Sequence, residues 1–531
     1  MIHNSLFKLL KNNSRFFFKY CLGGGVAFLV DLSLLYIFTE YLHLWYIYSA
    51  TLSFVITAVV NYTIQKYWTF KNDSRQIFRQ LTIFISIQIL GLILNNILLY
   101  CLVEFLGLWY IVGKIIAAGI VLIWNFGAGK AFVFNVHDVD ISIAGEIFPP
   151  SIGGPATYTY RLARYLLADQ ISFSVVYYGR LPSSPNDHDL TPFLTRISSR
   201  WPLPLKYFFY FLKLFSRSIH AKVIYAQGPV SSGWPALMVS RLLKKKLVVK
   251  VVGDYAWEQA RLERASRQGV DDWQQGPDPH SHNYWLNLKL NWLNKIERSV
   301  VRRADYVIVP SHYLKKIVLG WGADQNKIKV IYNSIFLRDK TDLSRQAAQA
   351  QIKISGDLII TVARLLPWKG VDLLIKIMPE LLKINPAFKL LIAGGGPEED
   401  NLRQLVKENK LEQQVFVLGS LSQKELAVYY RASAIFALNS GYEGLSHSIL
   451  DAMDYQLPII ASDIGGNPEL VQDDYNGLLV AYNNQEAWIN AFRRLWSNEK
   501  LRERLASSPL VKLDVFSFDT MIKETLKVIY S

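Results

Sequence analysis

The stretch NSGYEGLSHSILDAMDYQLPIIASDIGGNPELV, at residues 439–471, decides the fold of the larger part of this chain. It joins an acidic loop, a helix, a short apolar strand and a glycine turn, an order typical of an open α/β sheet. Glu443 lies in the loop, and Asp451 follows it by about two helical turns. Backbone N–H groups at the start of such a helix attract a phosphate or a sugar oxygen. The two acids either hold two sets of hydroxyl groups or serve as a helix cap and a solvated surface charge.

A second stretch, TVARLLPWKGVDLLIKIMPEL at 361–381, favours the first alternative. We expect a strand that ends at Ala363 and a helix that begins near Gly370, with Arg364 and Lys369 in the loop between them. Two fixed cations beside a helix start predict an anion site. A diphosphate leaving group needs such a site, because negative charge builds up on it as the bond breaks. The glycines at 394–396 either allow close backbone approach to this ligand or form a tight turn.

From about residue 141, short apolar runs alternate with helical stretches in two successive sets. This alternation predicts two doubly wound parallel sheets. We expect a first lobe at 141–335 and a second lobe at 336–531, with the final helix crossing back to the first. Ligands bind at the carboxyl ends of the strands in such folds, so the site is expected in the cleft between the lobes.

The first 135 residues carry a different pattern, with four long apolar runs at 21–41, 45–64, 81–103 and 108–129. Each is long enough to cross a hydrocarbon core of about 30 Å as a helix. The triplet LWY stands at 44–46 and again at 108–110, and other matches keep the same offset of 64 residues. We therefore expect an α-helical membrane bundle of four spans, built from two parallel hairpin repeats.

Charges outside the spans predict the topology. Lys and Arg residues precede the first span, lie between the second and third, and close the fourth at Lys130, whereas the other connections carry none. By the positive-inside rule, the N-terminus and everything after residue 130 face the cytoplasm. We expect the protein to lie in a bacterial-type plasma membrane, which its chain crosses several times.

Polar residues inside the spans are candidates for function, because charge is costly in a membrane. Asp31 and Lys114 either pair in the bundle interior or are hydrated separately by local water. Asn61, Lys66 and Trp68 either bind a lipid phosphate at the cytoplasmic face or anchor a helix end among the headgroups. Their counterparts in the second repeat include Asn125 and Lys130.

The composition narrows the possible partners. The 531 residues carry a net charge of +15 and are 51% hydrophobic, which suits contact with an anionic membrane. The basic residues are not gathered in one tract, so we expect no nucleic-acid partner. Cys21 and Cys101 lie in apolar stretches and are expected to be free thiols. GPDPHSH at 276–282 lacks a plausible ligand set, so no metal is expected. The segment 196–222 is either a basic amphipathic helix on the membrane surface or an ordinary outer helix.

Residues 17–134 resemble the GtrA-like family of four-span membrane proteins through GGGVAFLVDLSLLY and VNYTIQKYWTF. This resemblance implies the movement of polyprenyl-phosphate-linked sugars. Residues 142–530 resemble glycosyltransferase family 4 through the two stretches quoted first and through FPPSIGGPATY. That resemblance implies the GT-B fold and retaining transfer from a nucleotide-diphosphate sugar, with no metal or other cofactor.

The family 4 resemblance also implies roles for single residues. Arg364 and Lys369 would contact the diphosphate, and Glu443 the donor sugar. Asp451 stands where the family has a ribose-binding glutamate and is one methylene shorter. Asp254 is expected at the site although glycine precedes it, where many members have a histidine. The remaining candidates are glycines and backbone amides near the donor: Gly153, Gly154, Gly394, Gly395, Gly444, Leu445, Ser446, Gly465 and Gly466.

Together these patterns predict a membrane-bound retaining glycosyltransferase acting on a polyprenyl-linked or other cell-envelope glycan. Its expected partners are a nucleotide sugar, a lipid-linked glycan acceptor and membrane lipids. One alternative is a module that translocates a lipid-linked sugar, supplied by an accessory soluble domain. Another is a degenerate enzyme that only binds a nucleotide sugar.

Overall fold

The computed structural model describes residues 2–70, 72, 77–134, 139–151, 153–180, 189–276, 283–335, 341–508 and 513–531. These residues form two compact units. The first consists mainly of residues 1–142, and the second contains most of the remaining chain. Each unit is described by itself.

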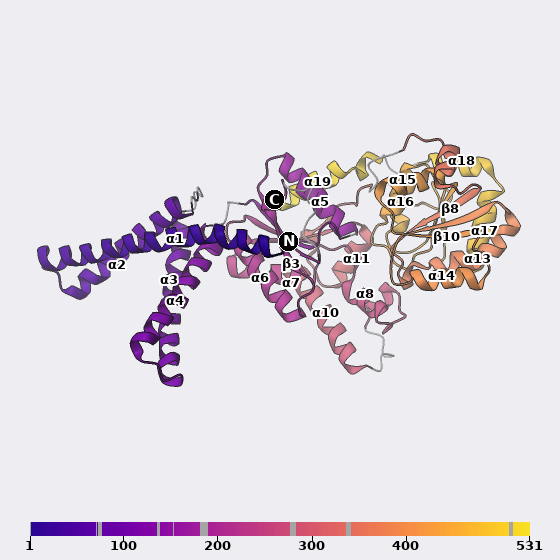
Figure 1. Cartoon of the computed structure of the whole chain (residues 1–531). Helices are drawn as coiled ribbons and strands as arrows, with labels where there is room; N and C mark the ends of the chain where they lie inside the picture. Colours follow the sequence, from indigo (N-terminus) through magenta and orange to yellow (C-terminus); the bar gives the residue numbers. More distant parts are fainter. Residues whose placement is uncertain are drawn as a thin grey trace. The chain divides into compact units, whose positions relative to one another are not determined.

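The first unit is helical and repeats its geometry as its sequence does. Its helices form two hairpins, α1 with α2 and α3 with α4 (Figure 1). The α-helices are α1 (Ile2–Tyr36), α2 (Tyr46–Ile64), α3 (Ile77–Tyr100) and α4 (Tyr110–Ala128). Each runs into a π-helical turn: η1 (Ile37–Tyr41), η2 (Gln65–Thr69), η3 (Cys101–Phe105) and η4 (Gly129–Phe134).

The offset of 64 residues relates the ends of these helices. Tyr36 and Tyr100 end the first helix of each hairpin, and Tyr46 and Tyr110 begin the second. The tryptophans of the two LWY triplets precede these starts with nearly the same backbone, φ −56° and ψ 131° at Trp45 and φ −57° and ψ 131° at Trp109. The repeated triplet therefore marks the same turn in both hairpins.

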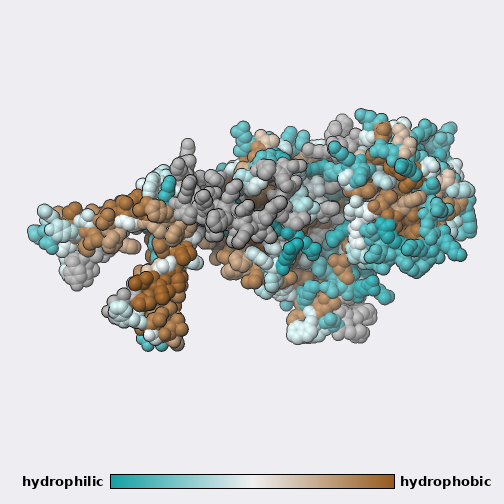
Figure 2. Space-filling view, in the orientation of Figure 1, coloured by the Kyte–Doolittle hydropathy of each residue, from teal (hydrophilic) through white to brown (hydrophobic). Residues whose placement is uncertain are grey.

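Apolar side chains cover the outside of the hairpins (Figure 2). Within the described residues, two helices are long and apolar enough to cross a membrane, Phe17–Tyr41 and Gln80–Phe105, and Ile115–Ala128 is a shorter apolar helix. All four predicted helices are present, and their exposed leucines and isoleucines suit a lipid surrounding better than water.

The first lobe contains a seven-stranded sheet in the order β3-β2-β1-β4-β5-β6-β7. Its strands are β1 (Ile141–Ile147), β2 (Phe173–Gly179), β3 (Leu194–Ser198), β4 (Val223–Ala226), β5 (Lys246–Lys250), β6 (Tyr306–Val309) and β7 (Ile328–Val330). Its α-helices are α5 (Gly154–Ala168), α6 (Leu203–Ser218), α7 (Gly233–Leu243), α8 (Tyr255–Leu262), α9 (Val270–Trp273), α10 (Tyr284–Arg303) and α11 (His312–Gly320). The shorter turns are η6 (Thr191–Phe193) and η7 (Gln325–Lys327).

The segment 196–222 contains a helix, as both interpretations of its sequence expected, but the helix covers only part of it, and contact with a membrane surface stays a prediction. Residues 196–198 belong to β3, and α6 begins only at Leu203, after Pro202 and with Pro204 in its first turn. Proline suits a helix start, because its missing N–H has no partner there. Burial lowers the pKa of Arg217, so this charge is not presented freely to solvent.

The second lobe contains a six-stranded sheet in the order β10-β9-β8-β11-β12-β13. Its strands are β8 (Asp357–Val362), β9 (Phe388–Ala393), β10 (Val415–Gly419), β11 (Ile435–Leu438), β12 (Ile459–Ser462) and β13 (Leu478–Val480). Its α-helices are α12 (Arg345–Ile352), α13 (Val371–Ile384), α14 (Glu399–Glu408), α15 (Gln423–Ala432), α16 (His447–Asp454), α17 (Gln485–Trp496) and α18 (Glu499–Ser507), and the chain ends in α19 (Phe518–Tyr530). The shorter turns are η8 (Pro367–Lys369), η9 (Asn467–Glu469) and η10 (Leu513–Phe516).

Apolar cores cover both faces of the second sheet. Ile359 packs into one core, while its neighbours Leu358 and Ile360 pack into the other. Successive residues of a strand point to opposite faces, so a continuous apolar run suits a parallel strand covered by helices on both sides.

Helix α19 returns to the first lobe. The Lys246 ammonium of β5 donates to the carbonyl oxygens of Val528 and Ile529, both at 3.0 Å. The Arg161 guanidinium of α5 lies over the ring of Phe518. The last helix of the chain therefore ties its end to the first sheet.

Candidate active site

The two loops singled out in the second lobe lie against each other. The Lys369 ammonium, in η8, is 2.6 Å from a carboxylate oxygen of Glu443. It also donates to the carbonyl oxygen of Tyr442 at 3.2 Å. Both charged side chains are only 13% exposed. The pair can therefore hold an anion on Lys369 and a hydroxyl group on Glu443 side by side, partly shielded from water.

Two further predicted loops meet at the start of α16. Ser446 caps this helix by accepting from the N–H of Ile449. The N–H of Gly466 donates to the carbonyl oxygen of Glu443 at 2.9 Å. Gly465 has φ +64°, and a side chain there would collide with the backbone of Glu443. The segment at 444–446 and the glycine pair after β12, Gly465 and Gly466, thus pack closely against each other.

The glycines after β9 lie beside the loop that carries Arg364. The N–H of Ala363 donates to the carbonyl oxygen of Ala393, and the N–H of Leu365 donates to the carbonyl oxygen of Gly395 at 3.0 Å. Gly394 has φ +136°, and a side chain would collide with Ala363. The Arg364 side chain is exposed at this edge. In the first lobe, Gly153 and Gly154 occupy the corresponding position, at the start of α5 after β1.

Asp451 is buried in α16, with only 3% of its surface exposed. Burial raises the pKa of Tyr430 well above its ordinary value, and the nearby charge of Asp451 raises it further. The Asp451 carboxylate therefore lies near enough to Tyr430, in the aromatic core beneath α16, to raise the pKa of that side chain. Its predicted contact with a ribose stays a prediction.

Asp254 has a structural position in the first lobe. One of its oxygens accepts from the N–H of Trp257 and the other from the Gln274 amide, each at 2.8 Å. Burial raises the pKa of Asp254, and these bonds offset part of that rise. One oxygen thus holds the start of α8 and the other is tied to Gln274 at the end of α9, an arrangement that favours a positioning role over direct chemistry.

Glu258, one helical turn further along α8, is a candidate that the motifs in the sequence did not indicate. Burial raises its pKa to about 7, the charges of Lys369 and Arg364 lower it, and those of Asp254 and Glu146 raise it. These effects place the carboxyl group near the second-lobe cations, although it belongs to the first lobe. The sequence offers one signal for this candidate: Glu258 follows Asp254 by four residues, a spacing that places two side chains on one face of a helix.

Gly253 lies between Glu258 and Tyr442. A Cβ atom there would be 2.9 Å from a carboxyl oxygen of Glu258 and 3.3 Å from the hydroxyl of Tyr442. A histidine side chain at this position, as the family 4 resemblance would imply, would therefore meet these two groups. In this chain, Glu258 and Tyr442 occupy the space that a histidine would need.

Direct contacts join the two lobes around this site. The Trp257 ring lies 5.1 Å from that of Trp368 and 5.0 Å from that of Tyr442, measured between centroids. Glu469 accepts from the N–H groups of His312 and Tyr313, at 2.9 and 2.7 Å. An acid at the start of α11 is favourable, because it satisfies free donors and the helix dipole.

The membrane-unit candidates include one strongly buried cation. Lys66 is 1% exposed, and its ammonium donates to the side-chain oxygen of Gln80 at 3.0 Å. Gln80 also accepts from the Tyr62 hydroxyl and donates to Asn72 and to the carbonyl of Val133. Lys66 thus joins the first hairpin to the second through Gln80, a residue that no pattern in the sequence singled out.

The other membrane-unit candidates have local polar contacts. Asp31 accepts from the Thr57 hydroxyl at 3.3 Å. Asn61 accepts from the Gln65 amide at 3.2 Å, and Asn125 donates to Gln88 at 3.0 Å. Trp68 is exposed, with the Lys19 ammonium over its ring. The side chains of Lys114 and Lys130 lie outside the described residues, so the pairing of Asp31 with Lys114 stays a hypothesis.

Among the residues that the structure describes, no group of three or more His, Cys, Asp or Glu side chains could hold a metal ion. The histidines at 280 and 282 lie outside the described residues.

Comparison with known proteins accounts for all three parts of the chain. Residues 19–134 match the GtrA/DPMS transmembrane domain, 152–338 match Glycosyltransferase Family 4, and 344–508 match Glycosyl transferases group 1. A D-inositol 3-phosphate glycosyltransferase of Nocardioides is 27% identical over 250 residues, which are 44% of this chain and 55% of the relative. An uncharacterized glycosyltransferase of Haemophilus influenzae is 31% identical over 173 residues, which are 32% of this chain and 48% of the relative. The chain thus spans about half the length of the curated relatives it matches.

Solved structures share the fold of the soluble part. Anabaena HepE in complex with UDP has a TM-score of 0.57 and 18% identity, covering 74% of this chain and 100% of that one. Sucrose-phosphate synthase from Thermosynechococcus elongatus has a TM-score of 0.59 and 20% identity, covering 74% and 98%.

The two parallel sheets and the site between them define the GT-B class, which confirms the predicted fold. The soluble part belongs to the group 1 and family 4 glycosyltransferases, and a GtrA/DPMS transmembrane domain precedes it in the same chain.

Proposed function

We propose that this protein is a membrane-bound retaining glycosyltransferase that moves a sugar from a nucleotide-diphosphate sugar to a lipid-linked glycan. The observation that carries the proposal is the shielded pair of Lys369 and Glu443, with Arg364 on the same loop as the lysine. An anion site beside a carboxylate suits a sugar diphosphate, which carries its negative charge next to its hydroxyl groups.

In this proposal the diphosphate of the donor displaces Glu443 from Lys369. The ammonium and the Arg364 guanidinium then stabilise the charge that develops on the leaving diphosphate. The freed carboxylate accepts hydroxyl groups of the donor sugar, and amides at 444–446 help to fix its orientation. The acceptor oxygen attacks from the face that the diphosphate leaves, and its proton passes to the departing phosphate oxygen.

The donor is a nucleotide sugar of undetermined base. Structures of Anabaena HepE are described with UDP and with UDP-glucose. UDP-glucose is therefore the first donor to test. No metal or other cofactor is part of the proposal.

The acceptor and the location rest on the membrane unit. The chain carries a GtrA/DPMS transmembrane domain, and its loop charges favour a cytoplasmic N-terminus and a cytoplasmic catalytic part. Nucleotide sugars are cytoplasmic, so a polyprenyl-linked or other cell-envelope glycan at the inner face of a bacterial-type plasma membrane is the acceptor that we propose.

The test uses membranes that contain the full-length protein. Labelled UDP- and GDP-sugars are added one at a time with bacterial polyprenyl-linked lipids, and label is counted in the organic extract. We expect label with one donor, and its loss in Glu443→Gln but not in Glu412→Gln, which changes an exposed glutamate. Binding of a nucleotide sugar without transfer to any acceptor would favour the degenerate, binding-only alternative.

The GtrA/DPMS match favours a second candidate function, translocation of the lipid-linked sugar. In that case, removal of residues 1–135 leaves transfer to a detergent-solubilised acceptor intact but stops the product from reaching the outer leaflet. Loss of both activities in the truncated protein would instead indicate that the membrane unit is needed for catalysis.

A further inference from the structure

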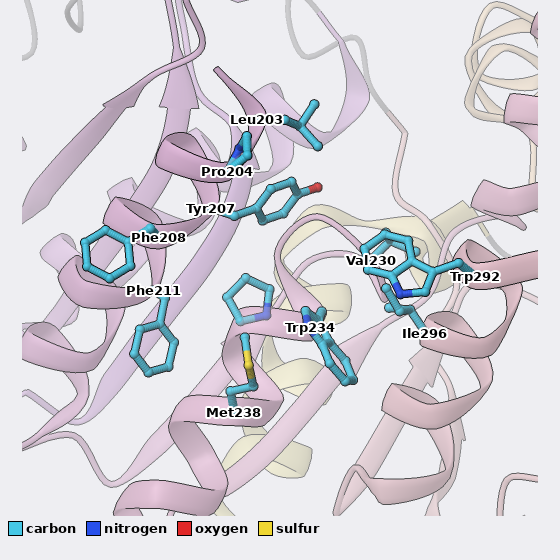
Figure 3. A pocket seen from close by; sticks show the side chains of 11 residues that line it. Leu203, Pro204, Tyr207, Phe208, Phe211, Val230, Trp234, Met238, Trp292 and Ile296 are labelled. Carbon is cyan, nitrogen blue, oxygen red and sulfur yellow. The ribbon is translucent and has the colours of Figure 1, made fainter. Parts of the chain in front are cut away.

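An apolar pocket of about 440 Å³ opens in the first lobe, within the size range of small-molecule sites. Three helices build it, and Figure 3 shows their side chains facing a common space. The residues that matter most are Leu203, Tyr207 and Phe211 of α6, Trp234 and Met238 of α7, and Trp292 of α10. Apart from the Tyr207 hydroxyl and the indole nitrogens, the side chains offer only hydrocarbon and sulfur to a ligand.

The mouth of this pocket is apolar and exposed. Leu203 is 63% exposed, Phe208 54% and Trp292 55%. The apolar surface continues along α10 to Leu288 and Trp285, at helical spacing on the same side as Trp292. A contiguous exposed apolar surface of this kind marks a binding site, because soluble surfaces rarely carry one without a function.

A cation lies at the edge of the pocket. The Lys206 ammonium is 5.7 Å from the ring centroid of Tyr207, which lines the pocket, and 5.4 Å from that of Tyr178. This position offers positive charge to the polar end of a ligand whose hydrocarbon part fills the pocket. The charge is complementary to a phosphate headgroup.

Hydrogen bonds link the surroundings of the pocket to Glu146. The Tyr178 hydroxyl donates to the carbonyl of Ser231, and the Ser231 hydroxyl donates to Glu146 at 2.8 Å. Ser231 follows Val230, which lines the pocket. Burial is the main cause that raises the pKa of Tyr207 in the pocket and of Glu258 in the cleft, and the charge of Glu146 raises both further. Glu146 is thus a neighbour that the pocket and Glu258 share.

We propose that this pocket binds the hydrocarbon chain of the acceptor lipid, with the lipid phosphate near Lys206 and the sugar acceptor directed toward Glu258. This inference rests on the proposed function, since it identifies the acceptor as a molecule with an apolar chain, an anionic group and a sugar in that order. The pocket recognises the first few units of the chain, and the exposed surface of α10 accommodates the more distant units.

Binding is tested separately from catalysis. The probe is a farnesyl-length prenyl phosphate with a photoreactive diazirine, added to the full-length protein in detergent, and labelled peptides are mapped by mass spectrometry. We expect label in α6, α7 and α10. Phe208→Ser and Trp292→Ser, both at exposed positions, should each lower labelling by roughly tenfold, as expected for the loss of one aromatic contact. Leu242→Ser, an equally exposed leucine of α7 outside the pocket, should leave it unchanged.

A second comparison separates the chain from the phosphate. Lys206→Gln should weaken labelling by the prenyl phosphate and spare labelling by the corresponding prenol, while excess inorganic phosphate should not displace either probe. Label confined to α1–α4 would overturn the inference, and so would equal labelling of all variants. Loss of label when the protein is diluted would also overturn it, because the site would then need two copies of the chain.

Transfer activity distinguishes this inference from the proposed function. Specific labelling of the pocket without transfer to any acceptor refutes the proposed function alone. Transfer that is equally fast for long-chain and short soluble acceptors, in the wild type and in Trp292→Ser, refutes the pocket as the chain site and leaves the transferase intact.

Discussion

Replacing Glu258 with glutamine tests whether partial burial near the second-lobe cations raises the pKa of this carboxyl group. Burial raises its pKa from an ordinary 4.5 to about 7. Below pH 4.5 the group is protonated in both the folded and the unfolded protein and has no differential effect. As pH rises from 4.5 to 7, the unfolded chain loses this proton first, so stability falls.

The size of this effect follows from the pKa difference. A rise from 4.5 to about 7 corresponds to at most roughly 3 kcal/mol of unfolding free energy at pH 8. Because Glu258 is partly exposed, we expect about 1–3 kcal/mol, or roughly 2–6 °C in melting temperature. Glu258→Gln keeps the shape of the protonated form and removes the ionisation. The variant should therefore melt close to the wild type at pH 4.5 and several degrees above it at pH 8.

The assay is thermal unfolding of the full-length protein in detergent across this pH range, followed by intrinsic tryptophan fluorescence. Trp257, which precedes Glu258 and packs on Trp368 and Tyr442, is one of fourteen tryptophans, so the signal reports unfolding of the whole chain, this site included. Glu412→Gln, an exposed glutamate of the second lobe, is the matched control and should follow the wild-type curve. Parallel curves for Glu258→Gln and wild type would show that the carboxyl group is solvated, and the reasoning about the cleft would fail.

The remaining predictions concern the donor, the first-lobe glycine and the membrane unit. Glu443→Gln should lower kcat by at least 100-fold with little change in nucleotide affinity, measured by steady-state transfer and by binding of UDP; an unchanged kcat would remove Glu443 from the site. Gly253→His should destabilise the protein by about 1–3 kcal/mol through contact with Glu258 and Tyr442, whereas Gly154→Ala, in open space, should melt within about 1 kcal/mol of the wild type. Asp451→Glu should tighten the binding of a nucleoside diphosphate, measured by calorimetry, if the acid at this position reaches a ribose. Weaker binding would show instead that the acid belongs to the core. Lys66→Met leaves the Gln80 oxygen with one fewer donor and should lower the stability of the helical unit in detergent by about 1–3 kcal/mol, while Lys19→Met, at an exposed ring, should not.

The features that the sequence predicted correctly are those with a local or topological cause. The 64-residue repeat fixes where helices end, because the same residues recur at the same turns, as Trp45 and Trp109 show. Lys369 and Glu443 were predicted as site residues without being paired, and their closeness has a topological cause, since both follow strands of one parallel sheet and carboxyl ends of such strands share an edge.

The features that the sequence missed depend on packing between distant segments. The apolar pocket needs α6, α7 and α10, and nothing in any one of these helices indicates the space that they enclose. For Lys66 the sequence left open a lipid-phosphate ligand or a helix anchor among the headgroups, and neither interpretation indicated its buried contact with Gln80 of the other hairpin. The sequence predicts Asp254 as a site residue from its place in the motif, and it does not indicate that one of its oxygens caps α8 while the other accepts from Gln274; its role in the site stays a prediction.

Gly253 and Glu258 are best understood as one change rather than two. A glycine at a position where the family 4 resemblance implies a histidine suggests, by itself, an enzyme that lacks a functional group. The structure shows that a side chain at 253 would meet the Glu258 carboxyl group and the Tyr442 hydroxyl. Glu297 accepts from the N–H groups of Tyr255 and Ala256 and so fixes the start of α8, which sets where Glu258 lies. The space beside Gly253 is therefore filled by a carboxyl group whose pKa burial raises to about 7. A carboxyl group in that range can exchange protons near neutral pH, so the glycine at 253 does not by itself mark a degenerate site.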